Sequence, residues 1–511
     1  ASQSVDLSGA VSFKDDGPSI TTHAAVADSL QVDETDLSKN DSENFKSLFN
    51  IDPGADGQQS LAYSLGLKSA SGTDSGVVDT ATGHHVFLYL EQGQVIGRVG
   101  SGSGANPQGP EAFTLSVSSS GNVTLDQIRA LQHPTGGPSS PDEAINLAAG
   151  SIKLNATVTD KDGDTASQSV DLSGAVSFKD DGPEVKARTG MSAAAVLDET
   201  DFSAGKDTAT INSQQISSLF ETPDYGTDGS GSVAYTLSAT DGANTGLFLA
   251  GGQDPIVLVK IDDHTYQGQT RSGHITAFTV QIDKASGQVN VTLSKPLEQQ
   301  QDGTSQADHD DSLQLSTGAG IKVTQTVTDK DGDSDSATSS QPLNITFKDD
   351  GPSVALSSLG KQNDHLGPTH TTTNFSDNFT QTADYGEDGS GSIHSSYALS
   401  VRSSGADSGV VDTATGHHVY LYLEHGQVIG RVGSGSGANP NGDKAFTFGI
   451  NSQTGVATLT QNRNIEHPQG AHTQTLGDAN LIQLTRTDTI TDADGDKALD
   501  QAFINVGTSL S

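Results

Sequence analysis

The distribution of hydrophobic residues along the chain predicts short β-strands rather than helices. Apolar side chains alternate with polar ones in short segments, as at Ile152, Leu154, Ala156 and Val158. A period of two is typical of a strand with one buried face. Clusters of Gly, Ser and Asp separate these segments, as expected of turns between strands. The pattern therefore predicts an all-β fold.

Two hairpins are expected in the first third of the chain. One joins HHVFLYLE (84–91) to QVIGRV (94–99) through a Gln92-Gly93 turn, and the other alternates from Phe113 to Leu125 around Gly121. Helix is expected to be minor, at the SLF segments 47–49 and 218–220 and at 127–132.

Internal repeats divide the chain into a tandem array. Residues 1–18 are identical to residues 166–183, and the block 74–107 recurs at 407–440 with two changes, Phe87 to Tyr420 and Gln92 to His425. We therefore expect a C-terminal remnant of a preceding repeat (1–18) and three modules, 19–183, 184–352 and 353–511. The strand count predicts immunoglobulin-like β-sandwich modules, enlarged by inserted hairpins within 72–109 and 405–442 and arranged as an elongated rod.

The net charge and the composition limit the classes of molecule that this chain is expected to bind. The 511 residues carry a net charge of -38, which disfavours nucleic acid and anionic membrane, because such a surface repels phosphate. Only about 12 of the 64 acidic residues are Glu, and the Asp excess beside Gly favours oxygen ligands carried on turns. The chain has no Cys, no initiator Met and no apolar run of membrane length. We expect an interior fragment, monomeric, with calcium ions and neighbouring repeats as its partners.

Two acidic motifs recur at the predicted module ends. TDKDGD stands at 159–164 and 328–333, with TDADGD at 491–496, and FKDDGP stands at 13–18, 178–183 and 347–352. In TDKDGD a carboxylate occupies every second position, but Gly163 lies at position four rather than six of the loop, so the motif is not an EF-hand. A calcium site built on it needs remote oxygens. We expect FKDDGP of the same module to supply them at the same module end.

The predicted calcium ligands are the carboxylates of these motifs and of the LDETD element at 197–201, which is expected just past a joint and is missing from the third module. They are Asp15, Asp16, Asp160, Asp162, Asp164, Asp180, Asp181, Asp198, Glu199, Asp329, Asp331, Asp333, Asp349, Asp350, Asp492, Asp494 and Asp496. Acidic glycine loops at 224–232 and 384–392 offer further carboxylates, which are those of Asp224 and Asp228 and of Asp384 and Asp388.

The remaining motifs indicate neither a histidine metal site nor a catalytic site. His84-His85 and His417-His418 are adjacent on predicted strands, so the two rings of each pair point to opposite faces and cannot bind one ion together. No catalytic constellation of Ser-His-Asp, paired Glu or HExxH type is found, and we expect no enzyme activity.

VTDKDGD, DLSGAVSFKDDGP and LDETD, in tandem modules of this size, resemble the extender repeats of large bacterial RTX adhesins, of the type I secretion "143" repeat type. The resemblance implies a calcium-stiffened extracellular fibre, exported by type I secretion, that projects a distal ligand-binding region from the cell surface for biofilm formation or host attachment. It also implies calcium ligands at Asp160, Asp162, Asp164, Asp180 and Asp181 and at their counterparts in the next repeat. The alternative is a lectin-like or host-protein-binding module that uses the 72–109 and 405–442 blocks.

Overall fold

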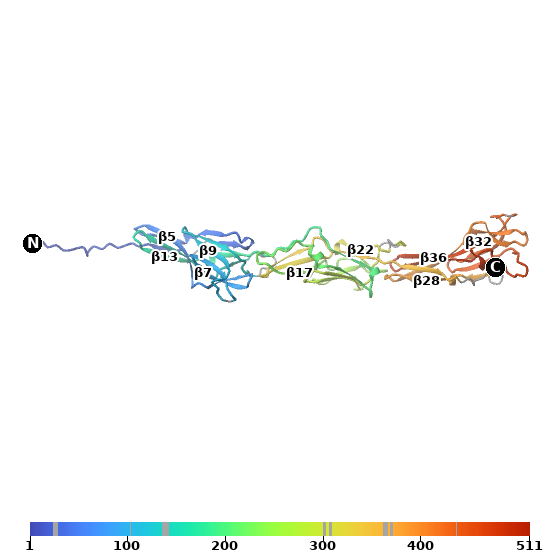
Figure 1. Ribbon diagram of the computed structural model, residues 1–511, viewed down its shortest axis with the longest axis horizontal. Helices are drawn as coiled ribbons and strands as arrows, with labels where there is room; N and C mark the ends of the chain where they lie inside the picture. The colour runs from blue at the N-terminus through green and yellow to red at the C-terminus, as the bar shows by residue number, and fades with distance from the viewer. Residues whose placement is uncertain are drawn as a thin grey trace.

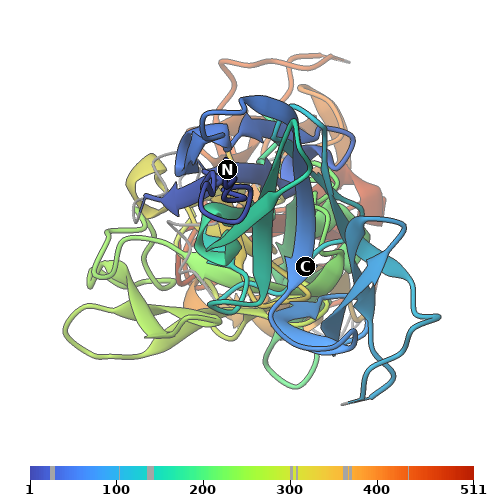
Figure 2. The ribbon, with the colours of Figure 1, turned by 90° about the vertical axis from the view of Figure 1, so that its left-hand side faces the viewer.

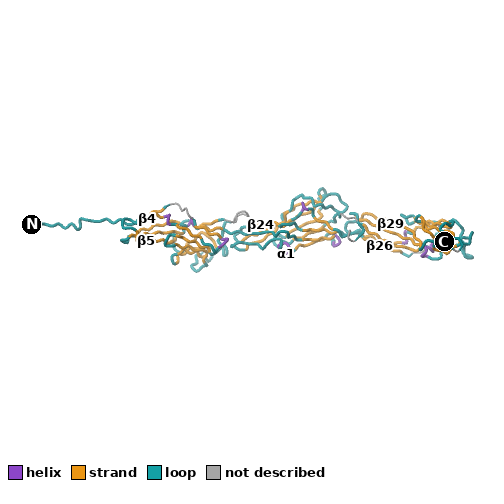
Figure 3. The backbone as a smooth tube through the Cα atoms, turned by 90° about the horizontal axis from the view of Figure 1, so that it is seen from above, coloured by secondary structure: helices purple, strands orange, loops and turns teal. Residues whose placement is uncertain are grey.

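The protein is a rod of three β-rich bodies that follow one another along its long axis (Figure 1). The computed structural model describes residues 1–23, 29–102, 104–134, 143–299, 303–305, 309–360, 366–367, 371–435 and 437–510. Viewed from the N-terminal side, the bodies lie one behind another (Figure 2). Many strands run roughly along the rod, so the turns between them gather at its joints (Figure 3).

Three separate hydrophobic cores account for the three bodies. One core contains buried residues between Ile20 and Phe178, the second between Val185 and Phe347, and the third between Leu356 and Leu510. These cores lie within 19–183, 184–352 and 353–511, which are called modules 1, 2 and 3 below.

Module 1 has a six-stranded sheet in the order β3-β10-β9-β8-β7-β6, two three-stranded sheets, β13-β12-β5 and β11-β14-β2, and the pair β1-β4. Phe113 of β9 and Phe178 of β14 meet with ring centroids 5.0 Å apart, which joins different sheets across one core. The strands are β1 (Ser19–Thr22), β2 (Leu30–Asp33), β3 (Asp41–Asn44), β4 (Phe49–Asp52), β5 (Gln58–Leu67), β6 (Thr73–Asp79), β7 (His84–Glu91), β8 (Gln94–Val99), β9 (Glu111–Val117), β10 (Asn122–Gln127), β11 (Ala144–Asn146), β12 (Ile152–Asp160), β13 (Thr165–Asp171) and β14 (Val176–Lys179).

Module 2 repeats this plan with sheets β16-β21-β20-β19-β18, β17-β23-β24 and β15-β25-β22. Phe278 and Phe347 take the places of Phe113 and Phe178, with ring centroids 5.2 Å apart. Its elements are β15 (Ala194–Asp198), β16 (Asp207–Ile211), α1 (Ser213–Ser217), β17 (Ser230–Ser238), β18 (Ile256–Asp262), β19 (Thr265–Thr270), β20 (Thr276–Ile282), β21 (Val289–Leu293), β22 (Ser312–Gln314), β23 (Lys322–Asp329), β24 (Ser334–Thr338) and β25 (Asn344–Lys348).

Module 3 returns to the six-stranded form, with the order β27-β34-β33-β32-β31-β30 facing β29-β35-β36 and β26-β28. Its strands are β26 (Ser353–Ser358), β27 (Thr372–Asn374), β28 (Phe379–Asp384), β29 (Ser390–Val401), β30 (Ala406–Val411), β31 (His418–Glu424), β32 (Gln427–Val432), β33 (Lys444–Ile450), β34 (Val456–Gln461), β35 (Ile482–Asp492) and β36 (Lys497–Asn505). Short 3-10 helices lie at Glu34–Asp36, Lys46–Leu48, Ser173–Ala175, Glu199–Asp201, Thr317–Ala319, Ser376–Asn378, Ala479–Leu481 and Gly507–Ser509.

The predicted all-β fold of tandem immunoglobulin-like sandwiches is confirmed. The 84–91 and 94–99 segments form a hairpin whose turn residues, Gln92 and Gly93, both have positive φ, as a tight two-residue turn requires. The 72–109 block adds its strands to the edge of the large sheet. The helix expected at 127–132 is wrong, because Gln127 ends β10 and Leu131 instead bridges to Asp79. Within the described ranges the one α-helix has five residues, too few to cross a bilayer.

Candidate metal centre

The two acidic motifs of one module lie at opposite ends of that module. The turn with Asp160, Asp162 and Asp164 lies beside the N-terminal tail, where Asp162 groups with Asp15 and Asp56. Asp180 follows β14 at the other end, where its carboxyl lies against that of Asp333 in module 2. The expected pairing of TDKDGD with FKDDGP of the same module is therefore wrong, and the pairing is between consecutive modules.

The first joint is defined as the group of eight carboxylates where module 1 meets module 2. Module 1 contributes Glu34, Glu143, Asp180 and Asp181, and module 2 contributes Asp228, Asp329, Asp331 and Asp333. The second joint, between modules 2 and 3, repeats the set with Glu199, Asp311, Asp349, Asp350, Asp388, Asp492, Asp494 and Asp496. Each joint therefore takes half of its carboxylates from either side.

A parallel strand pair brings Glu34 to the first joint. β2 pairs in parallel with β14, with Asp33 opposite Lys179, so the next residues, Glu34 and Asp180, leave the sheet side by side. Glu34 is fully buried, and its Oε1 accepts hydrogen bonds from the backbone N–H of Leu131 (2.9 Å) and from Gln127 Nε2 (2.7 Å). Its Oε2 has no hydrogen-bond partner. A buried oxygen left in this state is an available metal ligand.

The second joint has the same construction. β15 pairs in parallel with β25, with Asp198 opposite Lys348, which places Glu199 beside Asp349. Glu199 Oε1 accepts a hydrogen bond from the backbone N–H of Leu297 (2.9 Å), and Oε2 is unpartnered. LDETD therefore acts at the far end of its own module, and the expectation that it stands just past the preceding joint is wrong. Its absence from module 3 does not affect the second joint, because module 2 supplies Glu199 there.

The DGD turns present an aspartate oxygen in the same way at every copy. Oδ1 of the first Asp accepts the backbone N–H of the glycine three residues later, at 3.0 Å from Gly163, Gly332 and Gly495. The second oxygen, Oδ2 of Asp160, Asp329 and Asp492, is buried without a hydrogen-bond partner. One oxygen thus holds the turn and the other is free to face a cation.

The second Asp of each FKDDGP motif contacts the glycine loop of the following module. Backbone N–H groups donate to Asp16 from Ala55 (3.2 Å), to Asp181 from Thr227 (3.1 Å) and to Asp350 from Glu387 (3.2 Å).

The close approach requires a glycine in the loop. Gly226 has φ +64, and a Cβ there would overlap the carbonyl oxygen of Asp181. Further hydrogen bonds cross the first joint from Thr227 Oγ1 to the Glu34 carbonyl oxygen (2.7 Å) and from the His133 N–H to Asp331 Oδ2 (3.1 Å).

The carboxylates of the joints have strongly raised pKa values. Burial, followed by the contact with Asp333, raises the pKa of Asp180 to about 9. Burial and then the negative charges of Asp388 and Asp494 raise the pKa of Asp349 to about 10. Burial also raises the pKa of Glu34 to about 8. At neutral pH such groups either take up protons or require a cation, because closely spaced buried negative charges repel one another.

The joints fit a hard divalent cation. The donor set of the second joint is carboxylate oxygen, several of its buried oxygens lack hydrogen-bond partners, and Glu199, Asp349, Asp350 and Asp388 bring one oxygen each within 4.8 Å of one another. Oxygen-only, multi-carboxylate sets are what Ca²⁺ takes in proteins.

Three other predicted ligands lie outside the two joints. Asp198 caps the 3-10 helix at Glu199–Asp201 by accepting the Thr200 N–H at 3.0 Å, rather than entering the cluster. Asp15 and Asp16 lie on the exposed tail beside the DGD turn of module 1.

Sequence reasoning left out some residues that lie in the acidic groups. Glu34, Glu143, His133 and Asp311 lie in the two joints, and Asp56 lies in the group beside the N-terminal tail. Glu34 was detectable, since VDETD at 32–36 repeats LDETD at 197–201. Glu143 and Asp311 were not, because they enter only through the antiparallel partners of β14 and β25. The histidines expected on the surface are there, and His85 pairs with Asp74 at 2.8 Å with half of its side chain exposed.

A family model described as a domain of unknown function, DUF5801, matches the sequence three times, at residues 29–173, 194–340 and 357–505. The chain belongs to this family. A comparison with curated proteins finds no significant match.

Solved structures with some similarity include extracellular cadherin domains 3–6 of protocadherin gamma B2, at 12% identity over 96% of this chain and 92% of that chain, with a TM-score of 0.21. A Ca²⁺-stabilized adhesin with which an Antarctic bacterium binds ice matches at 9% identity over 96% and 98%, with a TM-score of 0.18. Scores this low do not establish a shared arrangement, so the function proposed below rests on the residues of this DUF5801 chain.

Proposed function

We propose that this chain is a non-catalytic, calcium-stiffened extender region of a large bacterial cell-surface adhesin. In this role its modules are extracellular spacers of the type I secretion "143" repeat type, in a protein of the RTX class exported by type I secretion. They hold a distal ligand-binding region away from the cell for biofilm formation or host attachment. The observation that carries the proposal is that consecutive modules share one buried group of carboxylates.

Shared ligands make the joint, rather than the module, respond to calcium. Asp349 and Asp388 belong to modules 2 and 3 respectively, and both are buried in the second joint. A cation bound between them attracts both modules, whereas without it the closed joint requires either that their negative charges repel or that the carboxylates take up protons at a cost in free energy. Sites of the extracellular type have dissociation constants on the order of 0.1 to 1 mM, so they fill outside a cell and stay largely empty in cytosol. A chain that must remain unfolded during export and stiffen afterwards benefits from that difference.

The blocks proposed for the alternative, lectin-like function contain few exposed rings. Phe87 and Tyr89 are each 7% exposed, because β7 contributes them to the large sheet and its packing. Sugar-binding surfaces usually present an accessible aromatic face. The described part of the 72–109 block therefore does not favour this alternative.

Small-angle scattering of the whole chain with calcium and with chelator tests the proposal. We expect the maximum dimension to decrease and the distribution of shapes to broaden when calcium is removed. A double variant, Asp349→Asn with Asp388→Asn, lacks two carboxylates of the second joint. Even in calcium it should have a smaller maximum dimension and a broader distribution of shapes than the parent. Asp310→Asn is the matched control, since Asp310 lies on the surface and pairs with Lys348 at 2.8 Å. An equally rigid rod in all conditions would refute the extender mechanism.

A further inference from the structure

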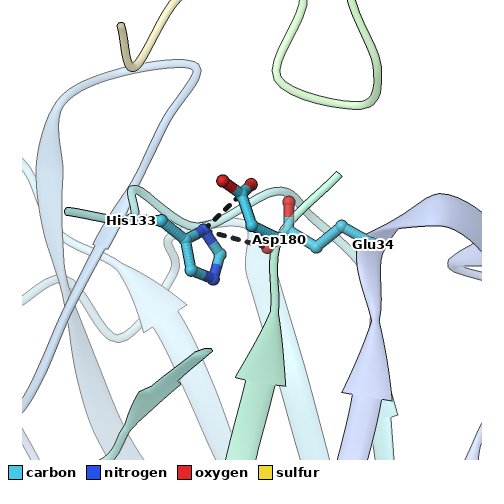
Figure 4. A group of neighbouring side chains, drawn as sticks. All are labelled: Glu34, His133 and Asp180. Carbon is cyan, nitrogen blue, oxygen red and sulfur yellow. Dashed lines mark ion pairs between the residues drawn. The ribbon is translucent and has the colours of Figure 1, made fainter. Parts of the chain in front are cut away.

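The first joint has a fully buried imidazole at a position where the second joint has an amide. The second joint also has a histidine, His309, but its Nε2 lies 3.0 Å from the Lys497 carbonyl oxygen and 4.0 Å from Asp496 Oδ2, so this nitrogen donates to the carbonyl and offers no lone pair to an ion. His133 follows β10 of module 1, and its side chain is 0% exposed. Its Nδ1 lies 3.3 Å from Asp180 Oδ1 and 4.0 Å from Glu34 Oε1, and Figure 4 shows the ring nitrogen turned towards both carboxylates. These three side chains bring one ligand atom each within 4.8 Å of one another. The geometry is that of a partial metal-coordination shell.

The other nitrogen of the ring sets the tautomer. Nε2 lies 3.2 Å from the backbone carbonyl oxygen of Phe178, which accepts hydrogen bonds only, so Nε2 carries the proton. Nδ1 then has a lone pair directed into the joint, where it has no hydrogen-bond partner. Burial lowers the pKa of His133, in keeping with a neutral ring. A histidine that donates one N–H to a backbone carbonyl and directs the other nitrogen at carboxylates has the orientation of a metal-bound imidazole.

The backbone holds His133 rigidly in this place. Its N–H donates to Asp331 Oδ2 of module 2 at 3.1 Å, and Leu131, two residues earlier, donates to Glu34 Oε1 at 2.9 Å. The imidazole is therefore positioned from both sides of the joint before any ion binds, which lowers the entropic cost of coordination.

The second joint provides an internal comparison. There the backbone N–H of Leu297 donates to Glu199 as that of Leu131 does to Glu34, and the residue two positions later is Gln299. Gln299 is 6% exposed, and its Oε1 and Nε2 have no hydrogen-bond partners. An amide oxygen suits Ca²⁺, whereas imidazole nitrogen suits Zn²⁺ and similar ions and contributes little to a calcium site. The two joints thus differ in ligand type at one equivalent position.

We propose that the first joint binds a divalent transition-metal ion of the Zn²⁺ class through His133 Nδ1 and the carboxylates of Glu34 and Asp180, while the second joint takes calcium. Asp180 also groups with Glu143 and Asp333, so it is placed to bridge this ion and a calcium ion held by the remaining oxygens. The rod would then contain one joint that responds to transition metal as well as to calcium. This inference rests on the proposed function in one respect, that the joints bind cations.

Co²⁺ is the probe, because its visible absorption reports nitrogen and oxygen coordination and calcium does not absorb. The whole chain, kept in millimolar calcium, is titrated with Co²⁺ and separately dialysed against Zn²⁺ for metal analysis. We expect one equivalent bound in the parent and an affinity lower by at least about tenfold in His133→Gln, since loss of even an outer-shell partner of a metal ligand has an effect of that size. Gln299→His should gain a second equivalent. His133→Gln copies the residue of the second joint, so its fold is expected to persist, and the calcium-dependent melting temperature checks this.

The outcomes separate this inference from the proposed function. Equal Co²⁺ binding by the parent and by His133→Gln would overturn the inference, since surface histidines such as His85 and His418 would then be the ligands. Absence of Co²⁺ binding to the parent would overturn it as well. If Co²⁺ binds through His133 but calcium changes neither melting nor shape, the inference stands and the extender mechanism fails.

Discussion

Replacing Asp349 with Asn should have opposite effects with and without calcium. Asp349 is fully buried in the second joint, and its pKa is raised from 3.8 to about 10 by burial and by the charges of Asp388 and Asp494. At pH 7.5 without metal, folding must therefore protonate a group that is ionised when unfolded. This costs at most about 5 kcal/mol, because each pH unit above the unfolded pKa costs about 1.36 kcal/mol. The actual cost is lower, since the joint can open and rehydrate the group.

Asparagine has nearly the same shape and no charge, so in chelator Asp349→Asn should stabilise the protein. For modules of this size each kcal/mol corresponds to about 2–4 °C in melting temperature, and a rise of several degrees is expected. In calcium the same change removes a ligand. If it weakens binding a hundredfold, protein held at about 100 times the original dissociation constant loses about 2 kcal/mol of its calcium-dependent stabilisation. The net effect in calcium is destabilising because this loss exceeds the gain of roughly 1 kcal/mol that a rise of a few degrees in chelator represents.

Differential scanning calorimetry at pH 7.5 measures the change in melting temperature caused by Asp349→Asn, once in chelator and once in calcium. Asp310→Asn, which removes an exposed carboxylate paired with Lys348, should change the melting temperature little in either buffer. Destabilisation by Asp349→Asn in chelator as large as in calcium would show that the carboxylate has a structural role unrelated to ion binding, and would refute the reasoning.

Three further predictions follow from the joints. In chelator, the free energy of unfolding should fall as pH rises from about 5 to about 9. The reason is that the folded pKa values of Glu34 (about 8) and Asp180 (about 9) exceed their unfolded values, so folding takes up protons in that window. A melting temperature that rises with pH over this range would contradict the prediction. Gly226→Ala should broaden the distribution of shapes measured by small-angle scattering in calcium, because the added Cβ would overlap the Asp181 carbonyl oxygen at the first joint. The control is Gly229→Ala, which should leave that distribution unchanged, since Gly229 also has positive φ but a Cβ there would have no atom within 4 Å. Glu34→Gln should weaken Co²⁺ binding measured by visible absorption at the first joint, where Glu34 groups with His133 and Asp180, and an unchanged titration would exclude Glu34 as a ligand.

Local signals in the sequence were sufficient for the strands, the hairpins and the acidic turns. Gln92-Gly93 marks its hairpin because both turn residues must adopt positive φ, and the DGD turns are held by a contact between residues three positions apart. Such features depend on neighbours in the chain. They can therefore be inferred from the sequence around them.

The membership of each metal centre could not be inferred in this way. Glu34 reaches Asp180 through a parallel strand pair between residues 146 positions apart, and both then meet aspartates of the next module. Sequence proximity suggested instead that Asp164 and Asp180 lie together. A strand leads from one end of a module to the other, so residues close in sequence on either side of it end up at different joints.

One repeated segment shows the division most directly. Residues 1–18 and 166–183 are identical in sequence, yet Phe13 is 95% exposed on the extended tail and Phe178 is 0% exposed in the core of module 1. Both copies have the same alternation, the same turn and the same acidic motif, because these features depend on residues that are adjacent in the chain. The second copy forms a strand because distant segments surround it: β2 and β11 on either side of β14 satisfy its backbone hydrogen bonds, and the opposing sheet covers its apolar face.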